Sequence, residues 1–198
     1  MQSDSMRRSN QERTDATRAA LVAAARRLFT GAGYAATGTP EIVGAAGVTR
    51  GALYHHFADK QTLFRAVVEQ EAAAVASEIE RAAPDATDAI EALRVGGRAY
   101  LEAMRMPGRT RLLLLDGPAV LGRALMDEID ARHGNRALRE GLTAAMRAGS
   151  LAKMPVGPLT ALLGAMFDRA ALAVQQGEAL DDQLAVMDAI VAGLARQT

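Results

Sequence analysis

Few side chains in this sequence have the types and the spacing that catalysis or metal binding requires. The three histidines are the adjacent pair His55 and His56 and the isolated His133, so no two of them have the spacing of metal ligands on one helix. There is no cysteine, which excludes disulfides, thiolate metal sites and cysteine nucleophiles. The acidic residues within 127–130 fit a charged helix face better than a pair of acid–base carboxylates. We therefore expect a protein that is not an enzyme, with no catalytic residue, no metal and no cofactor.

A second group of residues, between Ala46 and Phe57, has the spacing of a tight turn followed by a short helix. Gly47 can end one helix in the left-handed conformation, and the hydroxyl of Thr49 can cap the next. Leu53 and Phe57 are four residues apart and would face inward. The outward face is then small, polar and weakly basic: Arg50, Gly51, Ala52, Tyr54, His55 and His56. This pattern is typical of the second helix of a helix-turn-helix, which enters the DNA major groove, although a polar surface helix is the alternative.

Three predicted helices, near 14–31, 40–46 and 50–57, would position this face. The first has apolar residues at three- and four-residue spacing and would cover the other two. Thr39 as N-cap, with Pro40 at the first helical position, is a start signal for the second. About three residues join the second helix to the third, as a helix-turn-helix requires.

In order and spacing, residues 14 to 64 resemble the DNA-binding domain of the tetracycline-repressor (TetR) family. The residues that carry the resemblance are Gly33-Tyr34, Thr37 to Thr39, Glu41-Ile42, Ala46 to Gly51, Leu53 to Phe57, Lys60 and Leu63. Gly38, however, stands where the family usually has Thr or Ser, and Val43-Gly44 replaces a more usual Ile-Ala pair. We expect Gly38 to loosen the loop and to remove one phosphate contact.

The resemblance also implies which residues contact DNA. Arg50, Gly51 and Ala52, near the start of the recognition helix, would face the bases, where an arginine can bind guanine through two hydrogen bonds. The phosphate-facing set, rich in hydroxyl, imidazole and ammonium donors, would be Thr37, Thr39, Tyr54, His55 and Lys60. Thr49, the predicted cap, completes the expected DNA-binding surface.

The charge distribution agrees with one part of the chain that meets phosphate. The net charge is zero, but the residues up to Arg65 include nine Lys or Arg and only five Asp or Glu. Residues 1–13 are polar and charged, so we expect a disordered arm in which Arg7, Arg8 and Arg13 could touch DNA. The arm has no apolar signal core, and the apolar runs are too short to span a bilayer. Together with the absence of cysteine, this predicts a cytoplasmic protein with no membrane partner.

Two domains are expected, both all-α: a helix-turn-helix domain at 14–60 and a helical effector-binding and dimerisation domain at 61–198. The second would begin with a connecting helix at 61–81, capped by Asp59, whose inward stripe includes Glu71. In the family, the helices that follow the connecting helix enclose a ligand cavity, so the resemblance implies a cavity here. The expected lining, for each member of which a place in the core is the alternative, is Tyr100, Met104, Leu115, Met126, Ile129, His133, Met166 and Phe167.

The last two predicted helices, about 158–176 and 181–196, would form a four-helix bundle with a second copy of the chain. Their apolar residues lie close to a 3.5-residue seam, which predicts this interface: Leu159, Leu163, Met166, Ala170, Leu184, Met187, Val191 and Leu194. The whole pattern predicts a transcriptional regulator, foremost a repressor that binds a palindromic double-stranded DNA operator as a homodimer and that a small apolar or amphipathic effector releases. The alternatives are an activator and a ligand-binding helical dimer without DNA binding.

Overall fold

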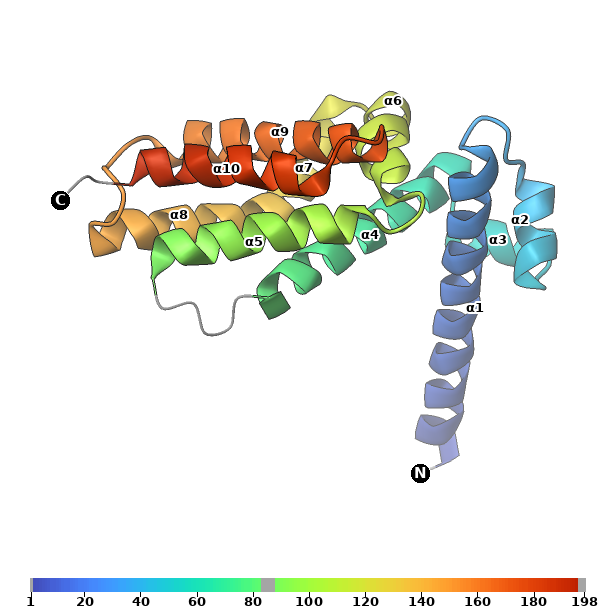
Figure 1. Ribbon diagram of the computed structural model, residues 1–198. Helices are drawn as coiled ribbons and strands as arrows, with labels where there is room; N and C mark the ends of the chain where they lie inside the picture. The colour runs from blue at the N-terminus through green and yellow to red at the C-terminus, as the bar shows by residue number, and fades with distance from the viewer. Residues whose placement is uncertain (1, 83–87, 196–198) are drawn as a thin grey trace.

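The structure is a computed structural model that describes residues 2–82 and 88–195, with side chains from Gln11 onward. Apart from an isolated bridge between Leu151 and Ala195, every regular element of these residues is helical, which confirms the predicted all-α class. Figure 1 shows the helices, which are α1 (Gln2–Ala32), α2 (Thr39–Ala46), α3 (Arg50–His56), α4 (Lys60–Ala82), α5 (Ala89–Met104), the π-helix η1 (Arg111–Asp116), α6 (Gly117–Leu121), α7 (Arg123–Arg132), α8 (Gly134–Ala148), α9 (Val156–Gln175) and α10 (Leu180–Leu194).

Helices α1, α2 and α3 form a three-helix domain at one end of the molecule (Figure 1). Apolar side chains that are at most 2% exposed fill its core: Leu21, Ala25, Phe29, Ile42, Leu53, Phe57 and Phe64. Gly47 adopts the predicted left-handed conformation, with a φ of 66°, and the backbone N–H of Ala52 donates to the Thr49 hydroxyl at 3.2 Å. The tight turn and the cap of α3 are therefore confirmed, and α2 and α3 have the connection of a helix-turn-helix.

The expected disordered arm is wrong for the residues that the structure describes, because α1 begins at Gln2 rather than near Thr14. Gln, Arg, Glu and Met are good helix formers, and neither Gly nor Pro interrupts the chain before Gly31. The polar composition therefore limits what this segment can pack against, but it does not prevent a helix. In Figure 1 the first part of α1 projects beyond α2 and α3. Met1 and the side chains of Arg7 and Arg8 lie outside the described part of the chain.

The start of α2 also differs from the prediction, because Gly38 is the N-cap and Thr39 is the first helical residue. The backbone N–H of Gly38 donates to the carboxylate of Glu41 at 2.7 Å. This is one half of a capping box, in which an acidic residue at the third helical position reaches back to the cap. Glu41 thus fixes the Gly38 amide, so the loop is held from the helix side even though its cap has no side chain.

Helix α4 leads from the three-helix domain into a C-terminal body, where α5, α8, α9 and α10 run alongside one another (Figure 1). The backbone N–H of Thr62 donates to the Asp59 carboxylate at 2.6 Å, which is the predicted cap of this helix. Along its length α4 contacts α1 on one side and α5 and α8 on the other. A movement of α4 would therefore shift its contacts with both the three-helix domain and the C-terminal body.

The chain between α5 and α8 changes from a π-helix to an α-helix just before Pro118. Proline has no N–H, and its ring clashes with the carbonyl four residues earlier, so an α-helix cannot continue through it unchanged. The preceding turn widens into the π-helix η1, in which the Gly117 N–H bonds to the Leu112 carbonyl five residues back. Helix η1 lies against both α1 and α4.

Candidate DNA-binding surface and ligand cavity

The solvent-exposed side of α3 carries most of the predicted DNA-binding residues. Arg50, Gly51, Tyr54 and His55 are exposed, and Ala52 is half-buried. The Arg50 guanidinium lies 5.5 Å from the centre of the Tyr54 ring. The pKa of Tyr54 is lowered mainly by the hydrogen bond between its hydroxyl and Thr39, and to a smaller extent by a hydrogen bond with Arg50. Thr39 of α2 and two residues of α3 therefore form one polar cluster across the helix-turn-helix.

Two residues expected to face phosphate are instead used inside the domain. Thr37 is only 2% exposed, and its hydroxyl donates to the Gly33 carbonyl at 2.8 Å, so the prediction of a phosphate contact is wrong for Thr37. The ammonium of Lys60 donates to the carbonyls of Tyr34 and Thr37 at 2.9 and 3.0 Å, and it lies 4.1 Å from the centre of the Tyr34 ring. An ammonium has three donors, so two of them hold the loop after α1 onto the start of α4.

Replacing Lys60 with methionine is expected to lower the free energy of unfolding by about 1–2 kcal/mol, because two charged hydrogen bonds and a cation–π contact are lost from a partly exposed site. Urea unfolding followed by circular dichroism measures this change. The exposed Lys153 provides the matched control, since K153M removes the same charge without these contacts. Equal stability of the two variants would contradict the assigned role.

A buried ion network joins the three-helix domain to the body through α4. Glu71 of α4 accepts from Arg26 of α1 at 2.7 Å and from Arg109, which precedes η1, at 3.0 Å. Arg109 is 2% exposed and also donates to Glu78 at 3.1 Å and to the Ala103 carbonyl at 2.8 Å. Burial opposes the charge of Glu71, but the hydrogen bonds from Arg26 and Arg109 hold its pKa below the usual value. The sequence signal for this network was an acidic residue within the apolar stripe of the connecting helix.

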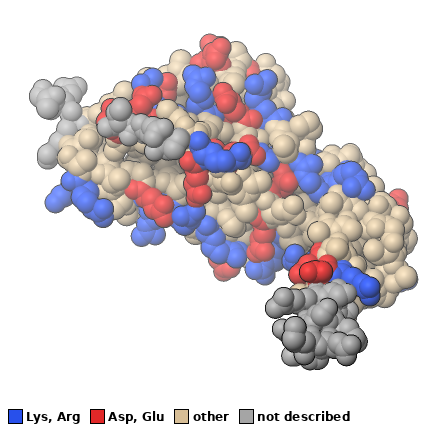
Figure 2. All heavy atoms as spheres, turned by 90° about the horizontal axis from the view of Figure 1, so that it is seen from below, with Lys and Arg blue, Asp and Glu red and all other residues tan. Residues whose placement is uncertain are grey.

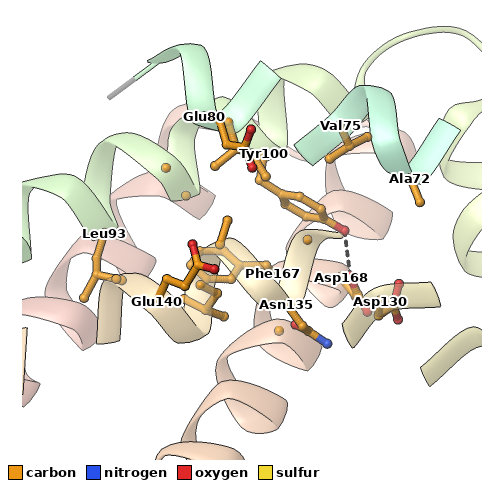
Figure 3. A pocket seen from close by; sticks show the side chains of 18 of the residues that line it. Ala72, Val75, Glu80, Leu93, Tyr100, Asp130, Asn135, Glu140, Phe167 and Asp168 are labelled. Carbon is orange, nitrogen blue, oxygen red and sulfur yellow. Dashed lines mark hydrogen bonds between the residues drawn. The ribbon is translucent and has the colours of Figure 1, made fainter. Parts of the chain in front are cut away.

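A cavity of about 340 Å³ lies in the body between α4, α5, η1, α7, α8 and α9. Its wall combines apolar side chains, glycines and a few acidic groups (Figure 3): Ala72, Val75, Ile79, Glu80, Ala92, Leu93, Gly96, Gly97, Tyr100, Leu113, Leu114, Asp130, Gly134, Asn135, Ala137, Leu138, Glu140, Gly141, Gly164, Phe167 and Asp168. Such a size is at the lower end of the range for small-molecule sites.

The structure places two of the eight predicted lining residues, Tyr100 and Phe167, in this wall. Met104, Met126 and Ile129 are buried in the core, which was the alternative for each of them. Leu115 is 48% exposed, and neither His133 nor Met166 lines the cavity. The prediction is thus wrong for six residues, because an apolar side chain on a helix can point to core, cavity or solvent and the stripe alone does not distinguish these directions.

Glycines within helices were the signal that the sequence reasoning missed. Gly in a helix interior costs up to about 1 kcal/mol relative to Ala, so several such positions indicate close packing or open space. Five lining residues are glycines: Gly96, Gly97, Gly134, Gly141 and Gly164. A β-carbon at Gly97 would lie 2.8 Å from the Phe167 ring, and one at Gly164 would lie 2.7 Å from the Asn135 side chain. The volume of the cavity therefore depends on these absent side chains.

Five of the eight residues of the predicted dimer seam on α9 and α10 are buried within the single chain, so the prediction is wrong for these five. Leu163, Ala170, Leu184, Met187 and Val191 are each at most 6% exposed because they pack inside the same chain. The other three residues, Leu159, Met166 and Leu194, are half-buried. The large apolar residues left exposed on these helices are instead Leu162 at 71%, Val186 at 60% and Ile190 at 43%. We call these last three residues the outer face.

Helix α9 is also the one described helix that is long and apolar enough to cross a membrane by length and composition alone. Only 33% of its apolar window is buried inside the chain. Asp168 and Arg169 interrupt that window near its middle, so the helix is unlike a membrane span and resembles an interface helix. An apolar helix with an uncovered side needs another protein surface to cover it.

Comparison with known proteins agrees with both halves of the molecule. Residues 21–67 match the family model described as bacterial regulatory proteins, tetR family, and residues 90–196 match a tetracyclin repressor-like C-terminal domain. A crystal structure of a TetR-family transcriptional regulator from Pectobacterium atrosepticum is 35% identical, covers 94% of this chain and 97% of its own, and superposes with a TM-score of 0.75.

Two curated relatives match over shorter stretches. The transcriptional regulator AcrR of Shigella flexneri is 36% identical over 110 residues, which are 55% of this chain and 51% of the relative. The transcriptional activator FasR of Mycolicibacterium smegmatis is 34% identical over 96 residues, which are 48% of this chain and 44% of the relative. The chain therefore spans about half the length of the curated relatives that it matches. From the helix-turn-helix, the two family models and the full-length structural match, we conclude that this chain belongs to the TetR family and is a DNA-binding transcriptional regulator, not an enzyme.

Proposed function

We propose that the chain acts as a homodimeric repressor that binds a palindromic operator and leaves it when a small molecule fills the cavity. The observation that supports DNA binding is the composition of the solvent-exposed side of α3. Gly51 has no neighbouring atom closer than 3.9 Å to the place of a β-carbon, so this face can approach DNA closely. Arg50 stands at the start of the helix beside Tyr54, where it can reach a base edge.

Binding to DNA would depend on the three-helix domain rather than on the charge of the whole molecule. On the face shown in Figure 2, Lys and Arg alternate with Asp and Glu along the body, so no broad field of one sign attracts phosphate there. Two copies of α3, held at a fixed spacing by a dimer, would then bind two half-sites about one helical turn apart or a multiple of that distance.

Release by a ligand is supported by the position of α4. Ala72, Val75 and Ile79 of this helix line the cavity, while Glu71, next to Ala72, binds Arg26 of α1. A ligand that changes the position of α4 would thus change the position of the three-helix domain. A nearly complete switch requires a ligand that binds the released form about 10⁴-fold more tightly than the DNA-bound form.

The test is selection of bound sequences from a random DNA pool, followed by a reporter in which the selected operator overlaps a promoter. A repressor lowers reporter expression, and an activator raises it. The activator remains the second candidate because one curated relative, FasR, is named as an activator. Failure to enrich any DNA sequence would overturn the proposed function.

Replacing Arg50 with alanine is expected to weaken binding to the selected operator by about 10- to 100-fold, which corresponds to the loss of one base contact of about 1–3 kcal/mol. Discrimination at one base-pair position should relax at the same time. Fluorescence anisotropy at constant salt measures both effects, and R147A, which removes an exposed arginine from α8, is the control. An R50A variant with wild-type affinity and selectivity would show that Arg50 does not contact a base.

A further inference from the structure

One end of the cavity carries two carboxyl groups side by side. Asp168 of α9 accepts a hydrogen bond from the Tyr100 hydroxyl at 2.6 Å, and Asp130 of α7 lies next to Asp168 (Figure 3). Within residues 2–82 and 88–195, neither carboxyl group forms an ion pair with a Lys or Arg, although the more distant charge of Arg123 lowers the pKa of both groups. Two arginines of α7 and α8 pair with other acidic residues. Arg123 pairs with Asp127 at 3.4 Å, and Arg136 pairs with Glu80 and Glu140.

The polar groups at this end accept hydrogen bonds more than they donate them. The Tyr100 hydroxyl directs its proton to Asp168, so it presents only lone pairs to the cavity. Ionised carboxylates are acceptors alone, and Asn135 is the one labelled neighbour in Figure 3 that also has N–H donors. An anionic ligand would meet negative charge here, whereas a ligand with N–H donors and a positive charge would be well matched.

The surroundings of the two carboxyl groups oppose their ionisation. Burial, and then the charge of Asp168, raise the pKa of Asp130 to about 6. Burial also raises the pKa of Asp168, although the hydrogen bond from Tyr100 opposes this shift. If both groups ionise, two like charges lie next to each other in a partly dry site and repel each other. A bound cation would relieve this repulsion.

The rest of the wall is suited to an apolar body rather than to a second charge. Val75, Ile79, Leu93, Leu113 and Phe167 line it, and glycines leave the backbone open between them. The two other acidic residues of the wall, Glu80 and Glu140, share one cation, Arg136, and their side chains are 50% and 65% exposed, so water screens the negative charge that is left over. The buried negative charge that has no ion-pair partner thus lies at the end formed by Asp130 and Asp168.

We propose that the cavity binds a small organic cation, with an apolar body against the wall of α4 and α5 and one ammonium group held between Asp130 and Asp168. This inference rests on the proposed function, because it names the ligand class of the same cavity. Compounds of this class have one protonated amine and an aromatic or aliphatic skeleton small enough for about 340 Å³.

Three probes with one skeleton and different charges test the proposal: naphthylmethylamine, naphthylmethanol and naphthoate. Isothermal titration calorimetry of the full chain at neutral pH, without DNA, measures the affinity of each. We expect the amine to bind at least about tenfold more tightly than the alcohol, a preference equal to one charged hydrogen-bonded contact. Naphthoate should bind more weakly than the alcohol, because it would face the carboxyl groups.

The variants D130N and D168N keep the shape of each side chain and remove its charge. Each is expected to reduce the preference for the amine over the alcohol by at least about threefold, and the double variant should abolish it, while the affinity for the alcohol stays unchanged. D127N is the matched control, since Asp127 lies on the same helix, is 64% exposed and does not line the cavity. Because the Asp130 side chain forms no hydrogen bond within the described part of the chain, D130N tests the proposal even if D168N disturbs the contact with Tyr100.

The outcomes separate this inference from the proposed function. Equal or tighter binding of the alcohol or of naphthoate, no binding of the amine, or an amine preference that survives the double variant would overturn the cation assignment. If the amine binds as expected but does not weaken binding to the selected operator, the ligand class stands and release by this ligand fails. If a neutral or anionic probe alone releases DNA, the proposed function stands and the cation assignment fails.

Discussion

The triple variant L162E, V186E and I190E is expected to be a folded monomer that binds operator DNA at least about 100-fold more weakly, because a second recognition helix no longer adds its binding energy. The three side chains of the outer face are exposed in the single chain, so glutamates there stay hydrated in a monomer. In a dimer they would be buried without partners, which is strongly unfavourable. Light scattering measures the mass, and anisotropy measures the affinity.

The control for this prediction is L184E. Leu184 lies on α10, as Val186 and Ile190 do, but it is only 3% exposed. A glutamate there would enter the core of the chain, so we expect loss of cooperative unfolding instead of a stable monomer. The two results separate the outer face from the seam that the sequence predicted. A triple variant that stays dimeric would place the interface on another surface of the molecule.

Replacing Arg109 with methionine is expected to lower the free energy of unfolding by about 2–4 kcal/mol, because the buried Glu71 loses one of its two charged hydrogen-bond partners. Glu71 would keep only Arg26, and the Ala103 carbonyl would lose the Arg109 donor and keep the backbone N–H of Met106. Chemical unfolding measures the loss. R105M is the control, since Arg105 is exposed four residues earlier in the same connection. Equal effects of the two variants would contradict the role assigned to the network.

The pH dependence of stability gives a second measurement of the same network. The pKa of Glu71 is lower in the folded chain than its usual value of 4.5, so the folded state favours the ionised form. The stabilisation is therefore complete above about pH 4.5, and it is lost as the pH falls through the folded-state pKa. The E71Q variant should lose this acid-dependent part of the unfolding profile. An unchanged profile would show that other groups account for it.

The helix-turn-helix could be predicted because its signals are local. The left-handed glycine Gly47, the cap Thr49 and the inward pair Leu53 and Phe57 all lie between residues 47 and 57, so the local order of residues determines the geometry. Even there, the prediction failed where tertiary packing decides. Thr37 has the right chemistry for phosphate, yet its side chain is buried and donates to the Gly33 carbonyl. Lys60 gives two of its three donors to the loop after α1, and its contact with phosphate stays a prediction.

The body shows the same limit more strongly. A heptad-like seam on α10 identifies an apolar side, but both Leu184 and Ile190 are apolar, and only packing against α5 and α9 decides which side is buried. The lining of the cavity likewise depends on which glycines oppose which side chains across separate helices.

The sequence by itself thus determined the helical class, the recognition helix α3 and the place of the connecting helix α4, since each follows from propensity, capping and periodicity along a single segment. The tertiary structure alone decided the contacts between segments. Glu71 binds an arginine 45 residues before it and another 38 residues after it, and two aspartates from separate helices share one end of the cavity. No local rule connects such distant residues, because their proximity arises from the packing of whole helices.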